Sequence, residues 1–299
     1  MTNNPVPIIV FHKGYAPYLE TCLKQAKKTN PDSRIILLGD KANAHIDYVD
    51  HFSADDYPGF RQFKPLYRHV SHLPVWLEHL WIQRWFVMRD FAREQGISRF
   101  LHIDTDVLLF CNISQESPRF DEFDMTFARW DENRLLAHCL LLNRIEFLDE
   151  FCQYITDIYQ DDSDFQRLVD RNTNRKGNRM LPPWICDMSL LADFYDRFSP
   201  NAFFLENCIQ DGVCFDPRIS DPGPFQSEFA FVRKQKIKRI RFIEGVPTAW
   251  LQDNTPIQMK AVHYHSFTKY LMPWHVQGVD AHRRFFWHTL LWEHKFLKR

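Results

Sequence analysis

The sequence predicts a mixed α/β domain built on a mostly parallel central sheet. Near the start of the chain, an apolar run at Pro7–Phe11 is followed by helical spacing over Tyr18–Lys28 and a second apolar run at Arg34–Leu38. A strand, a helix and a strand in this order form a βαβ unit, whose strands are parallel and whose crossover is right-handed. The composition agrees with a folded domain of this kind, since 45% of the 299 residues are apolar and 25% are charged, as in globular proteins with a sizeable core.

The remaining elements follow from periodicity and from turn residues. The first helix ends at Asn30-Pro31-Asp32, and the second strand ends at Gly39-Asp40. Residues 51–74 contain three prolines and one glycine, which predicts a loop that folds over a ligand. A long amphipathic helix is expected over Trp76–Gln95, with Arg84 on the same face as its apolar residues and Gly96 just after its end.

Downstream of this helix the sequence alternates between apolar strands and helices. Arg99–Phe110 reads as a strand that is interrupted by two carboxylates, and residues 160–179 read as a polar loop. Strands are expected at 124–128, 138–142, 202–205, 237–243 and 260–265, and helices at 146–159 and 184–198. No linker divides the chain, so one domain is expected over 1–278, followed by a C-terminal extension over 279–299.

Charge and missing motifs exclude several classes of protein. Lys plus Arg is 37 and Asp plus Glu is 38, so the formal charge is -1, which argues against a general nucleic-acid binder. The sequence lacks GxxxxGK[ST], GxGxxG, GxSxG and HExxH. This removes the simplest cases of a P-loop NTPase, a dinucleotide-binding enzyme, an α/β-hydrolase and a zincin.

Cysteine usage and the termini bear on the compartment. The seven cysteines form no CxxC pair and most lie in apolar contexts, as expected of buried thiols in a reducing compartment. The first residues show no secretory signal, and no apolar run reaches eighteen residues. We therefore expect a cytoplasmic protein.

The tripeptide Asp104-Thr105-Asp106 is the most informative motif. It follows the apolar residues Phe100–Ile103, and charged groups at the end of a buried strand are costly unless something compensates them. Side chains at i and i+2 project to the same side of an extended chain, so both carboxylates could converge on one cation. Oxygen ligands suit Mg²⁺ or Mn²⁺. An Asp pair in an ordinary turn is the alternative.

A second cluster lies far downstream, at Ala261–His275. His263 ends an apolar run, as a ligand presented from a strand would, and Lys269 follows six residues later. A lysine is a flexible point charge that can reach a phosphate. Taken alone, the two residues read equally as a core histidine and a surface lysine.

Together these motifs resemble the nucleotide-sugar-dependent glycosyltransferases of the GT-A fold, most closely the retaining family-eight type. The residues that carry the resemblance are Leu101–Leu108 around Asp-x-Asp, the later His263-Tyr264 and Lys269, and then Pro273-Trp274. Arg84 on the preceding helix matches a donor-contacting arginine of the family, and Ile185–Leu191 resembles its acidic segment beside the donor sugar. The similarity in order covers roughly residues 5–275.

The resemblance implies a GT-A, Rossmann-like domain that moves a sugar from a nucleotide-diphosphate sugar, a UDP-sugar above others, to a glycan, lipid or protein acceptor. Asp104, Asp106 and His263 would bind the metal, which neutralises the diphosphate leaving group. The imidazole favours Mn²⁺ over Mg²⁺, because nitrogen is a softer ligand than oxygen. Lys269 would contact the diphosphate and Arg84 the donor.

Three other residues receive roles with an alternative attached. Asp187 would act as the catalytic residue, by orienting the donor sugar or stabilising an oxocarbenium-like centre, or else it caps its helix. His12 and Asp40, at the ends of the first two strands, would hold the nucleotide or else shape turns. Two rival functions remain at this stage: a sugar-phosphate nucleotidyltransferase, and a non-catalytic carbohydrate-binding protein on a transferase scaffold.

The C-terminal residues Ala281–Arg299 predict an amphipathic helix. Its apolar stripe is rich in aromatic residues, and its other side is basic. Such a helix either docks on the domain or associates with the surface of an anionic membrane.

Overall fold

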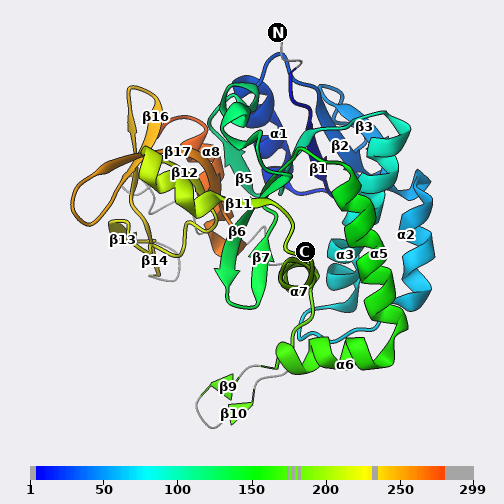
Figure 1. The fold of residues 1–299 in the computed structure, drawn as a ribbon. Coiled ribbons are helices and arrows are strands. Elements are labelled where there is room, and N and C mark those ends of the chain that lie inside the picture. Colours follow the sequence, from blue (N-terminus) through cyan, green and yellow to red (C-terminus); the bar gives the residue numbers. More distant parts are fainter. Residues whose placement is uncertain (1–4, 174, 177–178, 181–182, 231–234, 280–299) are drawn as a thin grey trace.

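The computed structural model describes residues 5–173, 175–176, 179–180, 183–230 and 235–279 (Figure 1). The helix predicted over 281–299, and with it the choice between docking and membrane contact, lies outside the described residues. Within the described ranges, no helix is both long and apolar enough to span a bilayer.

The predicted mixed α/β class with a mostly parallel central sheet is confirmed. The eight-stranded sheet has the order β11-β6-β8-β4-β1-β2-β3, and β7 pairs with β6 at its side. The pairs β11–β6, β4–β1, β1–β2 and β2–β3 are parallel, whereas β6–β8 and β8–β4 are antiparallel. The strands are β1 (Ile8–Phe11), β2 (Ile35–Gly39), β3 (Asp50–Ser53), β4 (Phe100–Ile103), β6 (Met125–Asp131), β7 (Arg134–Leu136), β8 (Cys139–Leu142) and β11 (Ala202–Phe204).

Alternate residues of the central strands serve two different cores. In β1, Ile9 and Phe11 pack in one core with the helices α3 (Val75–Glu94), α5 (Glu146–Gln160) and α7 (Asp187–Phe198). Ile8 and Val10 face the other core, which contains α1 (Pro17–Thr29) and a second sheet. Figure 1 shows α3 and α5 side by side with α2 (Pro58–Phe63), and the second sheet away from them. The central sheet is thus buried on both faces, as parallel sheets generally are.

The second sheet has five strands and brings the late part of the chain to the middle. Its order is β12-β17-β16-β15, and β5 pairs with β17. The strands are β5 (Val107–Leu109), β12 (Val213–Asp216), β15 (Ile240–Ile243), β16 (Val246–Trp250) and β17 (Pro256–His263). Because β4 and β5 flank Asp-x-Asp directly, that motif lies where the two sheets meet. The shorter elements are α4 (Ile113–Glu116), α8 (Met272–His275), β9 (Arg175–Lys176), β10 (Arg179–Met180), β13 (Ser227–Phe229) and β14 (Lys236–Lys238).

Three expectations about local structure are wrong. Residues 51–74 contain β3 and α2 instead of a continuous loop, and residues 160–179 contain the helix α6 (Asp162–Arg171). The latter looks polar because it buries little beyond Phe165 and Leu168, and it is held by ion pairs from its arginines to Asp193. The single strand expected over 237–243 is two strands, β14 and β15, which belong to different sheets.

The cysteines behave as predicted from composition. All seven lie in the described part of the chain, and all are buried and unpaired. Burial raises the pKa of several of these thiols, Cys22, Cys111 and Cys152 among them. These cysteines therefore fill the core as small apolar residues and are poor nucleophiles.

Candidate metal and ligand site

A tight turn presents the two carboxylates of Asp-x-Asp. The apolar strand β4 ends at Ile103, and the amide of Val107 donates to the carbonyl of Asp104 at 3.0 Å, which closes the turn. The amide of Asp104 is fixed in turn to the carbonyl of His138, also at 3.0 Å. The chain then continues as β5, so both carboxylates sit between two buried strands.

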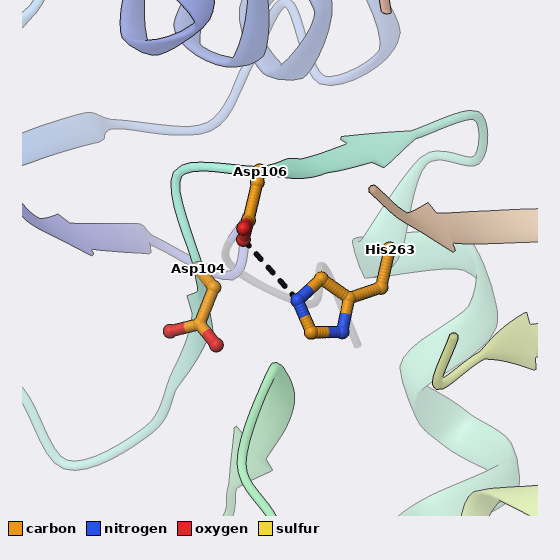
Figure 2. A group of neighbouring side chains, drawn as sticks. All are labelled: Asp104, Asp106 and His263. Carbon is orange, nitrogen blue, oxygen red and sulfur yellow. Dashed lines mark ion pairs between the residues drawn. The ribbon is translucent and has the colours of Figure 1, made fainter. Parts of the chain in front are cut away.

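Strand pairing brings the late histidine to the same place. In β17, which runs antiparallel to β5, His263 is paired with Val107, and the amide of Tyr264 donates to the carbonyl of Asp106 at 2.8 Å. Figure 2 shows the ring of His263 reaching from the end of β17 toward Asp106, with Asp104 beside them. The convergence expected from the two distant motifs is therefore a consequence of one strand pair.

The three side chains have the geometry of a metal-binding set. One ligand atom from each of Asp104, Asp106 and His263 lies within 4.8 Å of the other two. The Nε2 atom of His263 is 3.2 Å from Oδ1 of Asp106. Two ligands that are each ~2.1 Å from one ion lie ~3 Å apart when adjacent and ~4.2 Å apart when opposite. These residues therefore fit one divalent cation with small adjustments.

A carbonyl behind the ring selects the nitrogen of His263 that faces the carboxylates. The Nδ1 atom donates a hydrogen bond to the carbonyl of Pro217 at 2.7 Å, which leaves Nε2 toward Asp106. Pro217 lies in a segment that Lys238 holds in place. The ammonium of Lys238 contacts buried Asp216 at 2.8 Å and donates to the carbonyl of Arg218 at 2.8 Å. Such outer contacts fix ring orientation in metal sites. Sequence reasoning missed Pro217 because a backbone carbonyl leaves no side-chain signal.

Arg84 lies between two carboxylates at the floor of the site. Its Nη1 atom donates to Asp104 and its Nη2 atom to Asp187, both at 2.6 Å, and its side chain is 9% exposed. Burial alone would raise the pKa of Asp104. The guanidinium of Arg84, together with the rings of His102 and His263, outweighs this effect and holds that pKa well below its usual range. Arg84 thus points into the site, where its charge is fully compensated.

Asp187 opens α7 without capping it. The N-cap position is Cys186, whose amide donates to the hydroxyl of Ser189 at 2.9 Å, so the alternative role of Asp187 as the helix cap is wrong. The carboxylate is buried and also accepts from Nε1 of Trp85 at 3.3 Å. The carboxylate thus lines the cavity, and its contacts are with Arg84 and Trp85 and not with the start of its own helix.

Lys269 completes the charged group. It lies in a 3₁₀ turn, Ser266–Leu271, and its ammonium is 2.9 Å from Oδ2 of Asp106 and 4.4 Å from the ring centre of Tyr18. Burial would lower the pKa of Lys269, yet the Asp106 carboxylate raises it above the ordinary value. The lysine is therefore a permanent cation beside the metal-binding set.

The two residues expected at the nucleotide differ in their placement. His12 lines the cavity described below, where burial and the nearby Lys269 lower its pKa to about 4, so its ring is neutral at pH 7. The carboxylate of Asp40 accepts from the amides of Gly14 and Ala42, at 2.8 and 2.9 Å. Among the described residues, Asp40 is not part of the cavity lining, and its contacts are those of a turn.

Apart from Asp40, the residues that the sequence predicted for the site all line one cavity of about 780 Å³, a size common for ligand sites. One part of its lining is charged and includes Asp104, Asp106, Lys269 and Arg84; another is apolar and holds several tryptophans. No pattern in the sequence predicted this apolar part, because its residues come from separate segments that only the fold brings together. They are Leu73, Trp76, Leu77, Leu80, Trp81, Trp130, Leu136, Ala137, Trp184 and Met188.

Comparisons with known proteins yield structural likenesses only. No protein-family model matches the chain, and no curated protein sequence matches it. The solved structures to which it is similar include the galactosyltransferase LgtC with donor and acceptor sugar analogs (14% identity, 93% of this chain and 92% of that one, TM-score 0.48). Mouse xyloside xylosyltransferase 1 is another (11% identity, 67% and 84%, TM-score 0.45).

A third similar structure is the glycosyltransferase GlyE of Streptococcus pneumoniae, at 18% identity and a TM-score of 0.45. The match covers 98% of this chain but 61% of GlyE, so the chain spans about three fifths of that protein's length. Because each of these TM-scores lies below 0.5, inferences about function have to come from the residues of the cavity.

We expect the affinity for Mn²⁺ to fall as the pH decreases. Burial would lower the pKa of His263, but the carboxylates of Asp106 and Asp104 outweigh it and raise that pKa above 6.5. Only the neutral ring binds a metal, so affinity is full above the raised pKa and drops about tenfold per pH unit below it. Calorimetric titrations with Mn²⁺ between pH 8.5 and 5.5 measure this. An affinity that stays flat over that range would exclude His263 as a ligand.

Proposed function

We propose that the chain is a divalent-metal-dependent glycosyltransferase that moves a sugar from a nucleotide-diphosphate sugar to an acceptor hydroxyl. The observation that carries the proposal is the convergence of Asp104, Asp106 and His263 on one point, with the Lys269 ammonium beside them. Two carboxylates, an imidazole and a lysine at the wall of a large cavity suit a bound metal diphosphate.

The cation would be held by Asp104, Asp106 and His263, with Mn²⁺ favoured over Mg²⁺ by the imidazole. When bound, it supplies positive charge that stabilises the diphosphate as a leaving group. Lys269 would bind a phosphate oxygen and add a second positive charge there. His12, neutral and in the same lining, would bind the nucleotide, which we propose to be UDP.

Arg84 and Asp187 would act on the donor sugar from the floor of the cavity. Arg84 holds the carboxylates of Asp104 and Asp187 in place at 2.6 Å each, and it lines the cavity from which a donor would contact it. Asp187 would orient the sugar or stabilise positive charge at its anomeric carbon. Retention of configuration stays part of the proposal on the strength of the sequence resemblance, and a cytoplasmic location on that of the buried, unpaired cysteines.

The test is a screen of nucleotide sugars for release of the nucleoside diphosphate. We expect release from at least one UDP-sugar with Mn²⁺, and none after chelation with EDTA. Consumption of pyrophosphate with formation of a sugar phosphate would instead indicate a nucleotidyltransferase. Binding of sugars without any release would indicate a non-catalytic carbohydrate-binding protein, and either result would contradict the proposal.

Substitution of Lys269 separates diphosphate binding from metal binding. We expect Lys269→Ala to weaken UDP binding about tenfold, since one charge-assisted hydrogen bond is lost. Affinity for Mn²⁺ alone is retained, because Lys269 is a neighbour of Asp106 and not a ligand. Calorimetry with Mn²⁺ and then UDP measures both values, and Lys269→Arg is the charge-conserving control. Unchanged UDP affinity in Lys269→Ala would remove this role.

A further inference from the structure

The apolar part of the cavity contains an aromatic surface that metal and diphosphate binding leaves without a role. Trp76, Trp81 and Trp184 all line the cavity, and we call them the aromatic wall. Trp76 is 67% exposed although it lies in the first turn of α3. An exposed tryptophan beside a cavity usually marks a contact surface, because burying such a large side chain is favourable.

Helix α3 connects the aromatic wall with the charged part of the cavity. Trp76, Leu80 and Arg84 follow one another at four-residue spacing and therefore share one face of the helix, and all three line the cavity. At a rise of 1.5 Å per residue, Trp76 lies ~12 Å from Arg84 along the axis. An occupant of the wall would thus lie beside a donor sugar held near Arg84 and Asp187.

Two contacts hold Trp184 in position. Its Nε1 atom donates to Glu78 at 2.6 Å, and the guanidinium of Arg134 lies 4.6 Å from its ring centre. Glu78 is itself buried and accepts from the hydroxyl of Ser71 at 2.7 Å, which ties the wall to the segment before α3. A ring fixed in this way needs little ordering when a ligand binds.

We propose that the aromatic wall binds a sugar ring of a saccharide acceptor. This inference rests on the proposed glycosyltransferase function and names the class of its second substrate. The occupant must present an apolar face to flat indole rings and at the same time a hydroxyl to the charged part of the cavity. A saccharide offers both, with its C–H groups on one side of the ring and its hydroxyls around the edge. An indole ring offers a large apolar face to such a ligand, and the N–H of Trp184 is already donated to Glu78.

The nucleotide base is the other flat ring that the wall could accept. The segment His12–Ala16, which follows β1, also lines the cavity and contributes the neutral ring of His12 and the partly exposed Tyr15. Carboxyl ends of parallel strands are where nucleotides bind in open α/β sheets. We therefore assign the base to the β1 side and the acceptor to the α3 side.

The experiment is a titration with methyl glycosides of lactose, maltose, cellobiose and mannobiose, followed by saturation-transfer NMR, with Mn²⁺ alone and with Mn²⁺ plus UDP. We expect at least one disaccharide to bind the full chain. Trp76→Ala should weaken it about tenfold, the loss of one stacked ring, whereas Trp76→Phe retains most of the affinity. The control Phe229→Ala removes a side chain that is 64% exposed and outside the cavity lining, and should change nothing.

Separate measurement of Mn²⁺–UDP affinity distinguishes the possible failures. If no disaccharide binds, or if Trp76→Ala binds it as tightly as the unchanged chain, the acceptor assignment is overturned. If Trp76→Ala weakens UDP binding instead, the wall is the base site and the assignment is again overturned. If the unchanged chain does not bind Mn²⁺–UDP and also releases no nucleotide from any donor, the proposed function itself has failed.

Discussion

Asp106→Asn is expected to abolish metal-dependent donor cleavage. This carboxylate faces Nε2 of His263 at 3.2 Å and the ammonium of Lys269 at 2.9 Å, so it links all three groups of the charged cluster. The amide keeps the shape but loses the charge. Since even loss of a residue outside the ligand set can cost 10–100-fold in metal affinity, we expect Mn²⁺ to bind more than about 100-fold more weakly. Calorimetry and the nucleotide-release assay measure the two effects.

The matched control for this substitution is Asp121→Asn. Asp121 is half exposed and pairs with Arg99 on the surface, away from the cavity lining. We expect its Mn²⁺ affinity to stay within about twofold, because an exposed ion pair contributes little. Equal losses in both variants would mean that general charge, and not the site, determines metal binding.

Arg84→Met is expected to be the most destabilising single change in the site. It removes the guanidinium that lies 2.6 Å from both Asp104 and Asp187 and leaves two carboxylates in a largely buried setting. Breaking a buried ion pair from one side costs about 3–5 kcal/mol in the free energy of unfolding. Urea denaturation at pH 7 measures this loss.

The pH dependence of that loss identifies its cause. Arg84 lowers the pKa of Asp104 in the folded state. The ion pair therefore contributes to the free energy of unfolding above the usual carboxyl pKa, and this contribution disappears as the pH falls through the lowered value. The difference between Arg84→Met and the unchanged chain should therefore shrink at acid pH, and the second substitution Asp187→Asn should recover part of it. Arg34→Met, which breaks an exposed pair with Asp50, should cost at most about 1 kcal/mol. A loss independent of pH would point to packing instead.

Local sequence patterns sufficed to predict the helices and strands that have strong apolar periodicity. The first βαβ unit, the helix α3 and the strand that leads into Asp104 all lie within a few residues of their predicted places. The apolar residues of the strands are buried, whereas in α3 burial of apolar residues is confined to the later turns and Val75 and Trp76 at its start are exposed. Elements with few apolar residues escaped detection, and α6 is the clearest case: its stability comes from a cap at Asp161 and from arginines that reach Asp193 on another helix.

The site was predictable only as two separate motifs. Nothing near Asp106 in the sequence indicates that His263 lies beside it, because their proximity depends on the pairing of β5 with β17. The resemblance to a family supplied that link, and the pairing gives its physical cause. The aromatic wall could not be predicted from the sequence, since Trp76 and Trp184 look like ordinary apolar residues there. Only the folded chain shows that both line one cavity.

The shared metal is the central claim, and anomalous diffraction tests it most directly. Crystals grown with Mn²⁺ and UDP would be measured on both sides of the manganese absorption edge. The account predicts one strong anomalous peak within ~2.3 Å of carboxylate oxygens of Asp104 and Asp106 and of Nε2 of His263. A peak that lacks any of these three ligands, or no peak at saturating Mn²⁺, would contradict it.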